Sequence, residues 1–379
     1  MMMHDIVRTA APIAAAAALL ASQAAAAGPH GHPTHATGRA VFVQTNAPHG
    51  NQIIAFDRAG DGSLTQAGVF DTGGVGARAA GAVSDSLASQ GSLVFDAAHS
   101  ALVAVNAGSD SVTAFAVSGS TLRLLNVVPS GGEFPASIAV SGDLVYVLNA
   151  GGSGVVRGYR LDGQGLRPIP HSARSLGLAN GNPPNFLTSP GQIGFTPDGS
   201  KLIVTTKASG SAIDVFGVGA DGTLSASPVV SPSATPVPFA FTFDPSGRLV
   251  VGEAGASSVS TYSIEGDGTL SGAKSASDGQ TALCWIVPAQ GTYFVANTGS
   301  NTLSSFRVGA DGQPTLLSAV ASTTEAGPID LAATPDQAFL YGETGAAGTL
   351  DEYRVSADGS LTGLGVIAVK AGIEGIAAT

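Results

Sequence analysis

Charge is scarce in this sequence, and positive charge is the scarcer kind. Only 11% of the 379 residues are charged, and 16 Lys and Arg stand against 27 Asp and Glu, for a net charge of −11. Lys and Arg form no cluster anywhere in the chain. Nucleic acids and anionic membrane surfaces both attract basic faces. We therefore expect neither a nucleic acid nor a membrane as a partner.

Cysteine is nearly absent, since Cys284 is the single one. An intrachain disulfide is therefore excluded. The sequence also has no paired-cysteine motif, no His-Glu-x-x-His and no Gly-x-Ser-x-Gly. Only His30, His32 and His35 have a spacing that suits a metal ion, and a flexible leader is the alternative explanation for them. We expect no metal site and no cofactor.

The apolar run at Ala10–Ala21 is too short to cross a bilayer of about 30 Å. Arg8 precedes the run, and three small residues, Ala25 to Ala27, follow it. This order is typical of a cleavable signal peptide over residues 1–27. We expect a secreted or periplasmic protein, in which a flexible linker at 28–38 carries the three histidines.

Glycine, in contrast, is abundant, with 52 residues. A unit that recurs about every 45–50 residues contains a strand, a Gly-rich turn and a second strand with an aromatic residue near its end. Such a period with alternating apolar strands is typical of a β-propeller. We predict an all-β, seven-bladed β-propeller over residues 39–379. The polar residues at the strand ends are Asn46, Asn106, Asn149, Lys207, Glu253, Asn297 and Glu343.

The C-terminal segment is predicted to close the ring. Ile376–Thr379 repeats the text of Leu331–Thr334, the innermost strand of the last blade. The first blade begins with its second strand at Ala40–Thr45, so we expect the C-terminal strand to complete it and to remove the open sheet edges. Two connections, 73–91 and 170–191, are much longer than the others. Long loops on one face of a repeat array usually mark the binding face.

The strand-end residues are the candidate site. Asn tolerates left-handed turn geometry, so in four blades a structural role explains it. A turn has no need of Lys207, Glu253 or Glu343, and a charge there implies an ion pair or a ligand. Lys207 and Glu253 lie on adjacent blades, and we expect them either to pair or to bind a ligand at the channel mouth.

The repeat texts VNAGSDSVTAF, VLNAGGSG and VANTGSNTLSSF, with GADGTL turns, resemble those of the lactonase-type seven-bladed propellers. That family includes the bacterial propeller 6-phosphogluconolactonases and fungal carboxymuconate cyclase, and the resemblance extends over Arg39–Thr379. Family members often carry Pro-Arg-His before an inner strand. The corresponding prolines are present here without the Arg and His, so no catalytic residue can be carried over. The four triplets are Pro135-Ala136-Ser137, Pro190-Gly191-Gln192, Pro238-Phe239-Ala240 and Pro328-Ile329-Asp330.

Two functions follow as hypotheses. In the first, a lactonase-like hydrolase or cyclase-like isomerase acts on a small lactone, with Glu253 or Glu343 as general base and Lys207 or Arg78 stabilising the oxyanion. In the second, a non-catalytic propeller binds a ligand, glycan or protein through its long loops. A phosphorylated sugar is disfavoured beside this acidic chain, and we expect a monomer. The residues expected to bind the substrate are Arg78, Asn106, Asn149 and Asn297.

Overall fold

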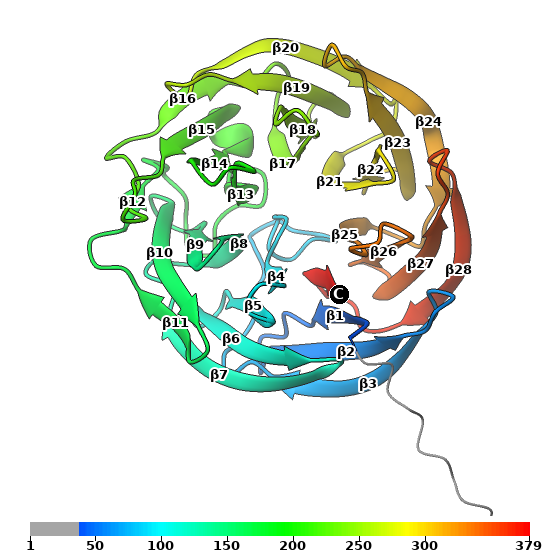
Figure 1. The fold of residues 1–379 in the computed structure, drawn as a ribbon, viewed down its shortest axis with the longest axis horizontal. Coiled ribbons are helices and arrows are strands. Elements are labelled where there is room, and N and C mark those ends of the chain that lie inside the picture. Colours follow the sequence, from blue (N-terminus) through cyan, green and yellow to red (C-terminus); the bar gives the residue numbers. More distant parts are fainter. Residues whose placement is uncertain (1–37) are drawn as a thin grey trace, which may run out of the picture. The chain divides into compact units, whose positions relative to one another are not determined.

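The computed structural model describes residues 38–379. The predicted signal peptide and the linker histidines His30, His32 and His35 lie outside the described residues. Within them, seven antiparallel sheets surround a central axis (Figure 1). The short 3-10 helix η1 (Lys207–Ser209) is the one helix of this part, and nothing in residues 38–379 forms a helix long and apolar enough to cross a membrane. The predicted seven-bladed all-β propeller is confirmed.

Each blade is a meander, and its innermost strand comes first in the chain in blades 2 to 7, whereas blade 1 takes its innermost strand from the C-terminal segment. Blade 1 contains β29 (Ile376–Ala378), β1 (Ala40–Gln44), β2 (Gln52–Arg58) and β3 (Leu64–Asp71). Blade 2 contains β4 (Leu93–Asp96), β5 (Ala101–Asn106), β6 (Ser111–Ser118) and β7 (Thr121–Pro129). Blade 3 contains β8 (Pro135–Ser141), β9 (Leu144–Asn149) and β10 (Val155–Asp162), and its outer edge is divided between β11 (Gly165–Pro168) and β12 (Arg174–Ser175).

The remaining blades have four strands each. Blade 4 contains β13 (Gln192–Phe195), β14 (Lys201–Thr205), β15 (Ala212–Gly217) and β16 (Val229–Pro232). Blade 5 contains β17 (Pro238–Phe243), β18 (Leu249–Glu253), β19 (Ser258–Ile264) and β20 (Leu270–Ser277). Blade 6 contains β21 (Leu283–Ala289), β22 (Thr292–Asn297), β23 (Thr302–Val308) and β24 (Pro314–Thr323). Blade 7 contains β25 (Pro328–Ala333), β26 (Phe339–Thr344), β27 (Thr349–Val355) and β28 (Leu361–Ala368).

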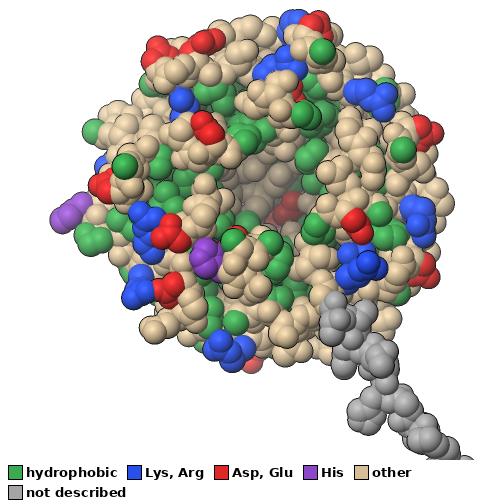
Figure 2. All heavy atoms as spheres, viewed as in Figure 1, with side chains coloured by type: hydrophobic (Ala, Val, Ile, Leu, Met, Phe, Trp, Pro, Cys, Tyr) green, Lys and Arg blue, Asp and Glu red, His purple; other side chains and the backbone are tan. Residues whose placement is uncertain are grey.

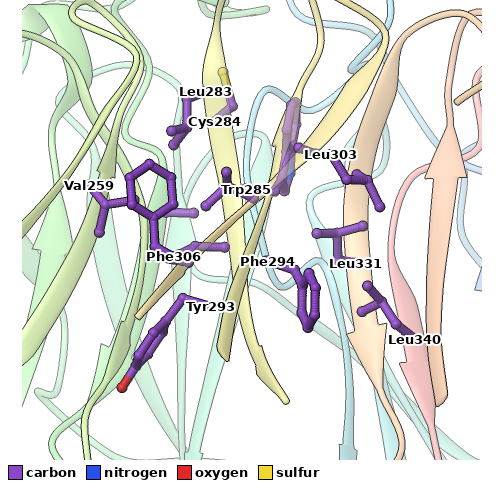
Figure 3. Close-up of a cluster of buried hydrophobic side chains, with 14 of the residues drawn as sticks. Val259, Leu283, Cys284, Trp285, Tyr293, Phe294, Leu303, Phe306, Leu331 and Leu340 are labelled. Carbon is purple, nitrogen blue, oxygen red and sulfur yellow. The ribbon is translucent and has the colours of Figure 1, made fainter. Parts of the chain in front are cut away.

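Burial follows the position of each strand within its blade. Every residue of the second strands β5, β9, β22 and β26 is buried, because neighbouring blades cover both faces of these strands. The outer strands β3, β20 and β28 are mostly exposed or half-buried. The core therefore consists of apolar layers between adjacent blades. Figure 3 shows one such layer, in which Trp285 and Phe294 of blade 6 lie near Leu331 and Leu340 of blade 7.

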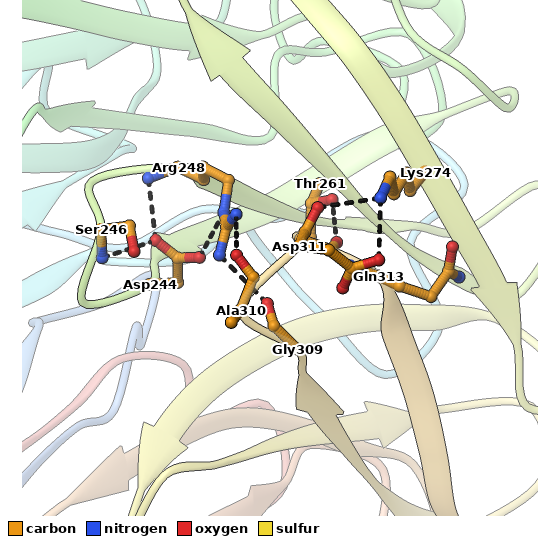
Figure 4. Close-up of polar contacts among 10 residues, drawn as sticks. Asp244, Ser246, Arg248, Thr261, Lys274, Gly309, Ala310, Asp311 and Gln313 are labelled. Atoms are coloured by element: carbon orange, nitrogen blue, oxygen red, sulfur yellow. Dashed lines mark hydrogen bonds and ion pairs between the residues drawn. The ribbon is translucent and has the colours of Figure 1, made fainter.

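Charged side chains add a second kind of contact between blades 5 and 6 (Figure 4). Arg248 forms an ion pair with Asp244 on its own blade, with Nε 2.6 Å from Oδ2. Its two terminal nitrogens donate to the backbone oxygens of Gly309 and Ala310 in blade 6, at 3.1 and 2.9 Å. The guanidinium thus holds the last hairpin of the next blade.

The C-terminal strand closes the ring as predicted. β29 pairs antiparallel with β1, at three positions from Val41–Ala378 to Val43–Ile376. Thr379 extends the pairing, because its N–H donates to the Ala40 oxygen at 2.9 Å, and Arg58 Nη2 donates to the Thr379 oxygen at 3.0 Å. The first and last strands of the described chain therefore belong to one sheet.

The register defines which residue occupies the same place at the end of each second strand. In blade 5, Tyr262 pairs with Leu249, and Glu253 follows Leu249 by four residues. The aromatic residue of each third strand gives the same count in the other blades. The equivalent residues are Thr45, Asn106, Asn149, Thr206, Glu253, Asn297 and Thr344.

This register corrects the sequence-based equivalence in three blades. Asn46 and Lys207 lie one residue after the shared position, and Glu343 lies one residue before it. Successive side chains of a strand point to opposite faces of the sheet, so Glu343 faces away from the side that the asparagines face. The three charged residues therefore do not form one symmetric set. The distance from the shared position to the aromatic residue is nine residues in blades 2, 5, 6 and 7, ten in blades 3 and 4 and eleven in blade 1, so sequence spacing alone did not fix the register.

Candidate functional site

The two long loops meet at one end of the ring. The Ala80 N–H donates to the Pro184 oxygen at 2.8 Å, and the Phe186 N–H donates to the Ala80 oxygen at 3.0 Å. Nearer the axis, the Gln90 N–H donates to the Gly191 oxygen at 3.0 Å. The sequence predicted that both loops lie on one face. The structure joins them directly through their backbones.

A cavity of about 270 Å³ lies between these loops and blades 4, 5 and 6. Loop 73–91 and loop 170–191 form one side of it, and the start of blade 5 and blade 6 forms the other. Most of the lining is apolar. The residues of the wall are Val83, Ser84, Asp85, Ala88, Phe186, Leu187, Lys207, Val237, Phe239, Ala254, Gly255, Ala282, Cys284, Trp285 and Thr298.

Lys207 is the cation of this cavity, and its side chain fastens the two loops. Its Nζ donates to the Ala88 oxygen of one loop at 2.6 Å, and to the Phe186 oxygen and Ser189 Oγ of the other at 2.6 and 2.9 Å. The ammonium also lies 4.9 Å from the centre of the Phe239 ring. Only 1% of the residue is exposed, and burial lowers the pKa of Lys207 to about 8, although Asp85 and other acidic groups partly offset this.

The predicted ion pair between Lys207 and Glu253 is wrong. Lys207 donates its three N–H groups to atoms of the loops. Both carboxylate oxygens of Glu253 instead accept hydrogen bonds from hydroxyl groups of blades 4 and 5. Those donors are the side chains of Ser233, Thr235, Ser258, Ser260 and Tyr262.

Asp85 lines the same cavity, where its charge interacts with Lys207, and it was not predicted from the sequence. Its Oδ1 accepts the N–H groups of Leu87 and Ala88 at 3.1 and 2.5 Å, while Oδ2 is buried and accepts no N–H or hydroxyl group of the described residues. Burial raises the pKa of Asp85, and contacts with Glu374, Lys207 and the two N–H groups act in the opposite direction. These donors favour the ionised form of Asp85.

Glu374 is the partner of Asp85, and it was also missed. The two carboxyl groups are within hydrogen-bonding reach of each other. Burial first, and then the charge of Asp85, raise the pKa of Glu374 well above its ordinary value. We infer that Glu374 keeps the proton and donates it to ionised Asp85. This contact links loop 73–91 to the segment that closes the ring.

Glu343, a predicted base, lies near the axis but outside the cavity lining. Its Oε2 accepts the Gly375 N–H at 3.0 Å, and Oε1 has no donor among residues 38–379. Burial and the neighbouring Asp330 raise the pKa of Glu343 well above its ordinary value. Burial raises the pKa of Asp330 to about 7. Figure 2 shows a hollow at the centre of the ring with acidic atoms in its depth, and charges of both signs scattered around the rim.

Two of the three predicted asparagines connect neighbouring blades. Asn106 donates to Ser111 and Thr113 of its own blade, and its oxygen accepts from Asn51 and Thr72 of blade 1. Asn149 donates to the Ser130 oxygen, after the last strand of blade 2, and to Val155 of its own blade. Asn297 donates to Thr302 and Ser304 of its own blade. All three are fully buried, and none lines the cavity.

Arg78 supports the loop that carries Asp85. Its Nη1 donates to the Ala82 and Val83 oxygens at 3.1 and 3.0 Å. It lines a separate, smaller cavity of about 160 Å³ together with Lys370. The structure thus places Lys207 in the cavity between the long loops and the other predicted site residues outside its lining.

Backbone conformation at the cavity is unusual. Ala88, Lys207, Val237 and Ala282 all line it and have φ of 56°, 49°, 64° and 60°. Left-handed φ is uncommon for residues with a Cβ, and for β-branched Val237 it is especially unfavourable. Such conformations cost about 1–3 kcal/mol each and cluster at functional sites. Their concentration here favours this cavity as the site.

The model of the family described as "Lactonase, 7-bladed beta-propeller" matches residues 24–168. The periplasmic gluconolactonase of Pseudomonas aeruginosa superimposes with a TM-score of 0.70 at 18% identity, covering 90% of this chain and 99% of that one. The chain resembles the lactonase-type seven-bladed propellers. None of the curated proteins matches the sequence significantly.

Two further solved structures are similar to this chain. A Bacteroides fragilis protein proposed to be a 6-phosphogluconolactonase gives a TM-score of 0.70 at 17% identity, covering 92% of this chain and 100% of that one. A Lactobacillus plantarum protein gives 0.71 at 21% identity, covering 90% and 99%. At such identities the likeness establishes the fold, while the activity depends on the site.

Proposed function

We propose that this chain is a lactonase-like hydrolase that opens a small lactone in the cavity between its two long loops. The observation that carries the proposal is that one cation, Lys207, and one carboxylate, Asp85, line the same apolar cavity. The lactonase family match and the Pseudomonas gluconolactonase support the reaction class.

The two groups have complementary roles in ring opening. Asp85 accepts a proton from water as the water oxygen bonds to the lactone carbonyl carbon. The charge of Lys207 stabilises the oxyanion that forms, which is most effective in an apolar site. The carbon–oxygen bond of the ring then breaks, and the leaving oxygen takes the proton from Asp85. The product is a hydroxy acid.

The other predicted residues receive structural or reserve roles in this proposal. Glu253 and the asparagines serve the structure of the blades, since they lie outside the cavity lining and hydrogen-bond to atoms of the blades. Glu343 is the reserve candidate for the base, because one of its oxygens has no donor among the described residues. Arg78 holds the loop of Asp85 in place.

A panel of lactones assayed in a pH-stat tests the proposal, because hydrolysis releases an acid. Replacement of Asp85 with Asn should lower kcat about 10²–10⁴-fold, the usual share of a general base. Asp351→Asn is the matched control, since Asp351 is a buried aspartate of blade 7 that does not line the cavity. Full activity of Asp85→Asn, with activity lost in Glu343→Gln, would transfer the role of base to Glu343.

One observation favours the non-catalytic alternative, in which the propeller only binds a ligand. All three N–H groups of Lys207 are engaged by the loops, so it can offer an oxyanion its charge but no free N–H. A wild-type protein that binds lactones without hydrolysing any of the panel would establish this alternative.

Export and oligomeric state complete the proposal. The signal-like residues 1–27 support a secreted or periplasmic protein, and N-terminal sequencing of the exported form should begin near Gly28. We propose a monomer, which sedimentation of the mature protein tests.

A further inference from the structure

Three exposed apolar side chains stand at the entrance of the cavity. Val83 is 80% exposed, Phe186 41% and Leu187 44%, and all three belong to the cavity wall. Val83 comes from loop 73–91, and the other two come from loop 170–191. The other exposed large apolar residues of the described chain lie on outer strands, and none of them lines the cavity: Val69, Leu124, Val127, Val230, Leu317, Val320 and Val366. A group of apolar side chains around an opening indicates an apolar ligand.

The wall below this entrance is apolar as well. The rings of Phe239 and Trp285 lie with their centres 4.9 Å apart, and both line the cavity. The indole N–H of Trp285 donates to the Ser89 oxygen at 3.0 Å, so it is not free for a ligand. Thr298 Oγ1 donates to the Pro328 oxygen at 2.9 Å. The cavity therefore offers few partners to the hydroxyl groups of a sugar lactone, and buried hydroxyls without partners lower affinity.

Charge in the cavity also disfavours a phosphorylated ligand. Lys207 is the single Lys or Arg of the lining, and Asp85 is its single carboxylate. Phosphate recognition relies on several N–H donors or arginine pairs, and Lys207 has no N–H left to give. A neutral carbonyl group fits between the two charges better than a dianion does.

We propose that the ligand of this cavity is a lactone that carries an apolar substituent, with the ring carbonyl between Lys207 and Asp85 and the substituent over Val83, Phe186 and Leu187. This inference rests on the proposed function for the identity of the reacting group. The volume of about 270 Å³ lies just below the range of about 300–1,000 Å³ that is usual for ligand pockets. The ring leaves room in the cavity for the first part of the substituent, and a longer substituent extends along the entrance.

Binding can be measured without turnover, because the chain has one tryptophan and it lines the cavity. The probes are γ-lactams with alkyl substituents of increasing length, which keep the ring carbonyl and resist hydrolysis. Quenching of Trp285 fluorescence should give a Kd that falls about fourfold per methylene, the value of one buried CH₂ group. In the double variant Phe186→Ser, Leu187→Ser, the Kd should depend much less on the length of the alkyl substituent.

Matched controls are Val230→Ser and Val366→Ser, which replace exposed valines of the outer strands and should leave the series unchanged. Melting curves confirm that every variant is folded. An affinity that does not depend on alkyl length, or tighter binding of a polyhydroxylated lactam, would overturn the inference. Chain-length-dependent binding without hydrolysis of the matching lactones would uphold the inference and refute the hydrolase. Hydrolysis that prefers sugar lactones would uphold the hydrolase and refute the apolar substituent.

Discussion

Removing the C-terminal strand should destabilise the whole ring. Deletion of residues 371–379 removes Ile373 and Ile376, which are 0% and 5% exposed, and each such side chain contributes about 1.5–3 kcal/mol. It also removes the Gln44 to Gly375 and Thr379 to Ala40 backbone bonds, at about 1 kcal/mol each. The sum is about 5–8 kcal/mol. That loss is comparable to the stability of an entire domain, about 5–15 kcal/mol.

Circular dichroism melts of the intact and truncated proteins measure this loss. We expect the truncated protein either to melt at least about 10 °C lower or to fail to fold, because 1 kcal/mol shifts Tm by about 2–4 °C in domains of 150–250 residues and by somewhat less in larger ones. A synthetic peptide of residues 371–379, added in excess, should restore part of the stability. A truncated protein that melts within a few degrees of the intact one would refute the role of β29 in ring closure.

Three further predictions concern buried charges. Glu253→Gln should lower the free energy of unfolding by about 1–3 kcal/mol in urea titrations, because an amide cannot accept the hydroxyl bonds of both oxygens; unchanged stability with lost turnover would instead make Glu253 the base. Arg248→Ala should lower the free energy of unfolding by about 1–3 kcal/mol. The control is Lys274→Ala, which should lower it by about 0–1 kcal/mol because the ion pair of Lys274 with Asp311 is exposed. Equal losses in the two variants would contradict the role of Arg248 between the blades. The pKa of Asp330 is raised from 3.8 to about 7, so the folded state holds this proton more tightly; its contribution to stability is present below about pH 4 and is lost as the pH rises to 7. In Asp330→Asn, the free energy of unfolding should change less with pH between about 4 and 7. An unchanged pH dependence would contradict its assignment to Asp330.

The repeat alone predicted the architecture because each blade repeats the same physical requirements. A strand with both faces buried, a tight turn and an aromatic residue recur in the sequence as they recur in space. Ring closure was predictable for the same reason, since Ile376–Thr379 repeats the text of another inner strand. The two long loops were also located correctly as neighbours, because a propeller brings connections of one kind to one face.

The site was less predictable, because it is built outside the repeat. Asp85 lies in a long loop and Glu374 in the closing segment, and neither has an equivalent in the other blades. The sequence did indicate the long connection 73–91 and the closing segment as unusual, and this was the signal that could have led to Asp85 and Glu374. Repeat reasoning favoured Glu253, yet the repeated position is the one that connects blades. One residue of register separated Lys207 and Glu343 from that position, and a one-residue shift reverses the face of a strand side chain.

The position of Glu374 has a consequence for biosynthesis. Its carboxyl group interacts with Asp85, yet Glu374 lies just before β29 and follows all of blades 2 to 7 in the chain. A nascent chain that already has all of blades 2 to 7 still lacks this partner for Asp85. Asp85 thus acquires its buried partner only after the segment that follows blade 7 has been synthesised and β29 has paired with β1.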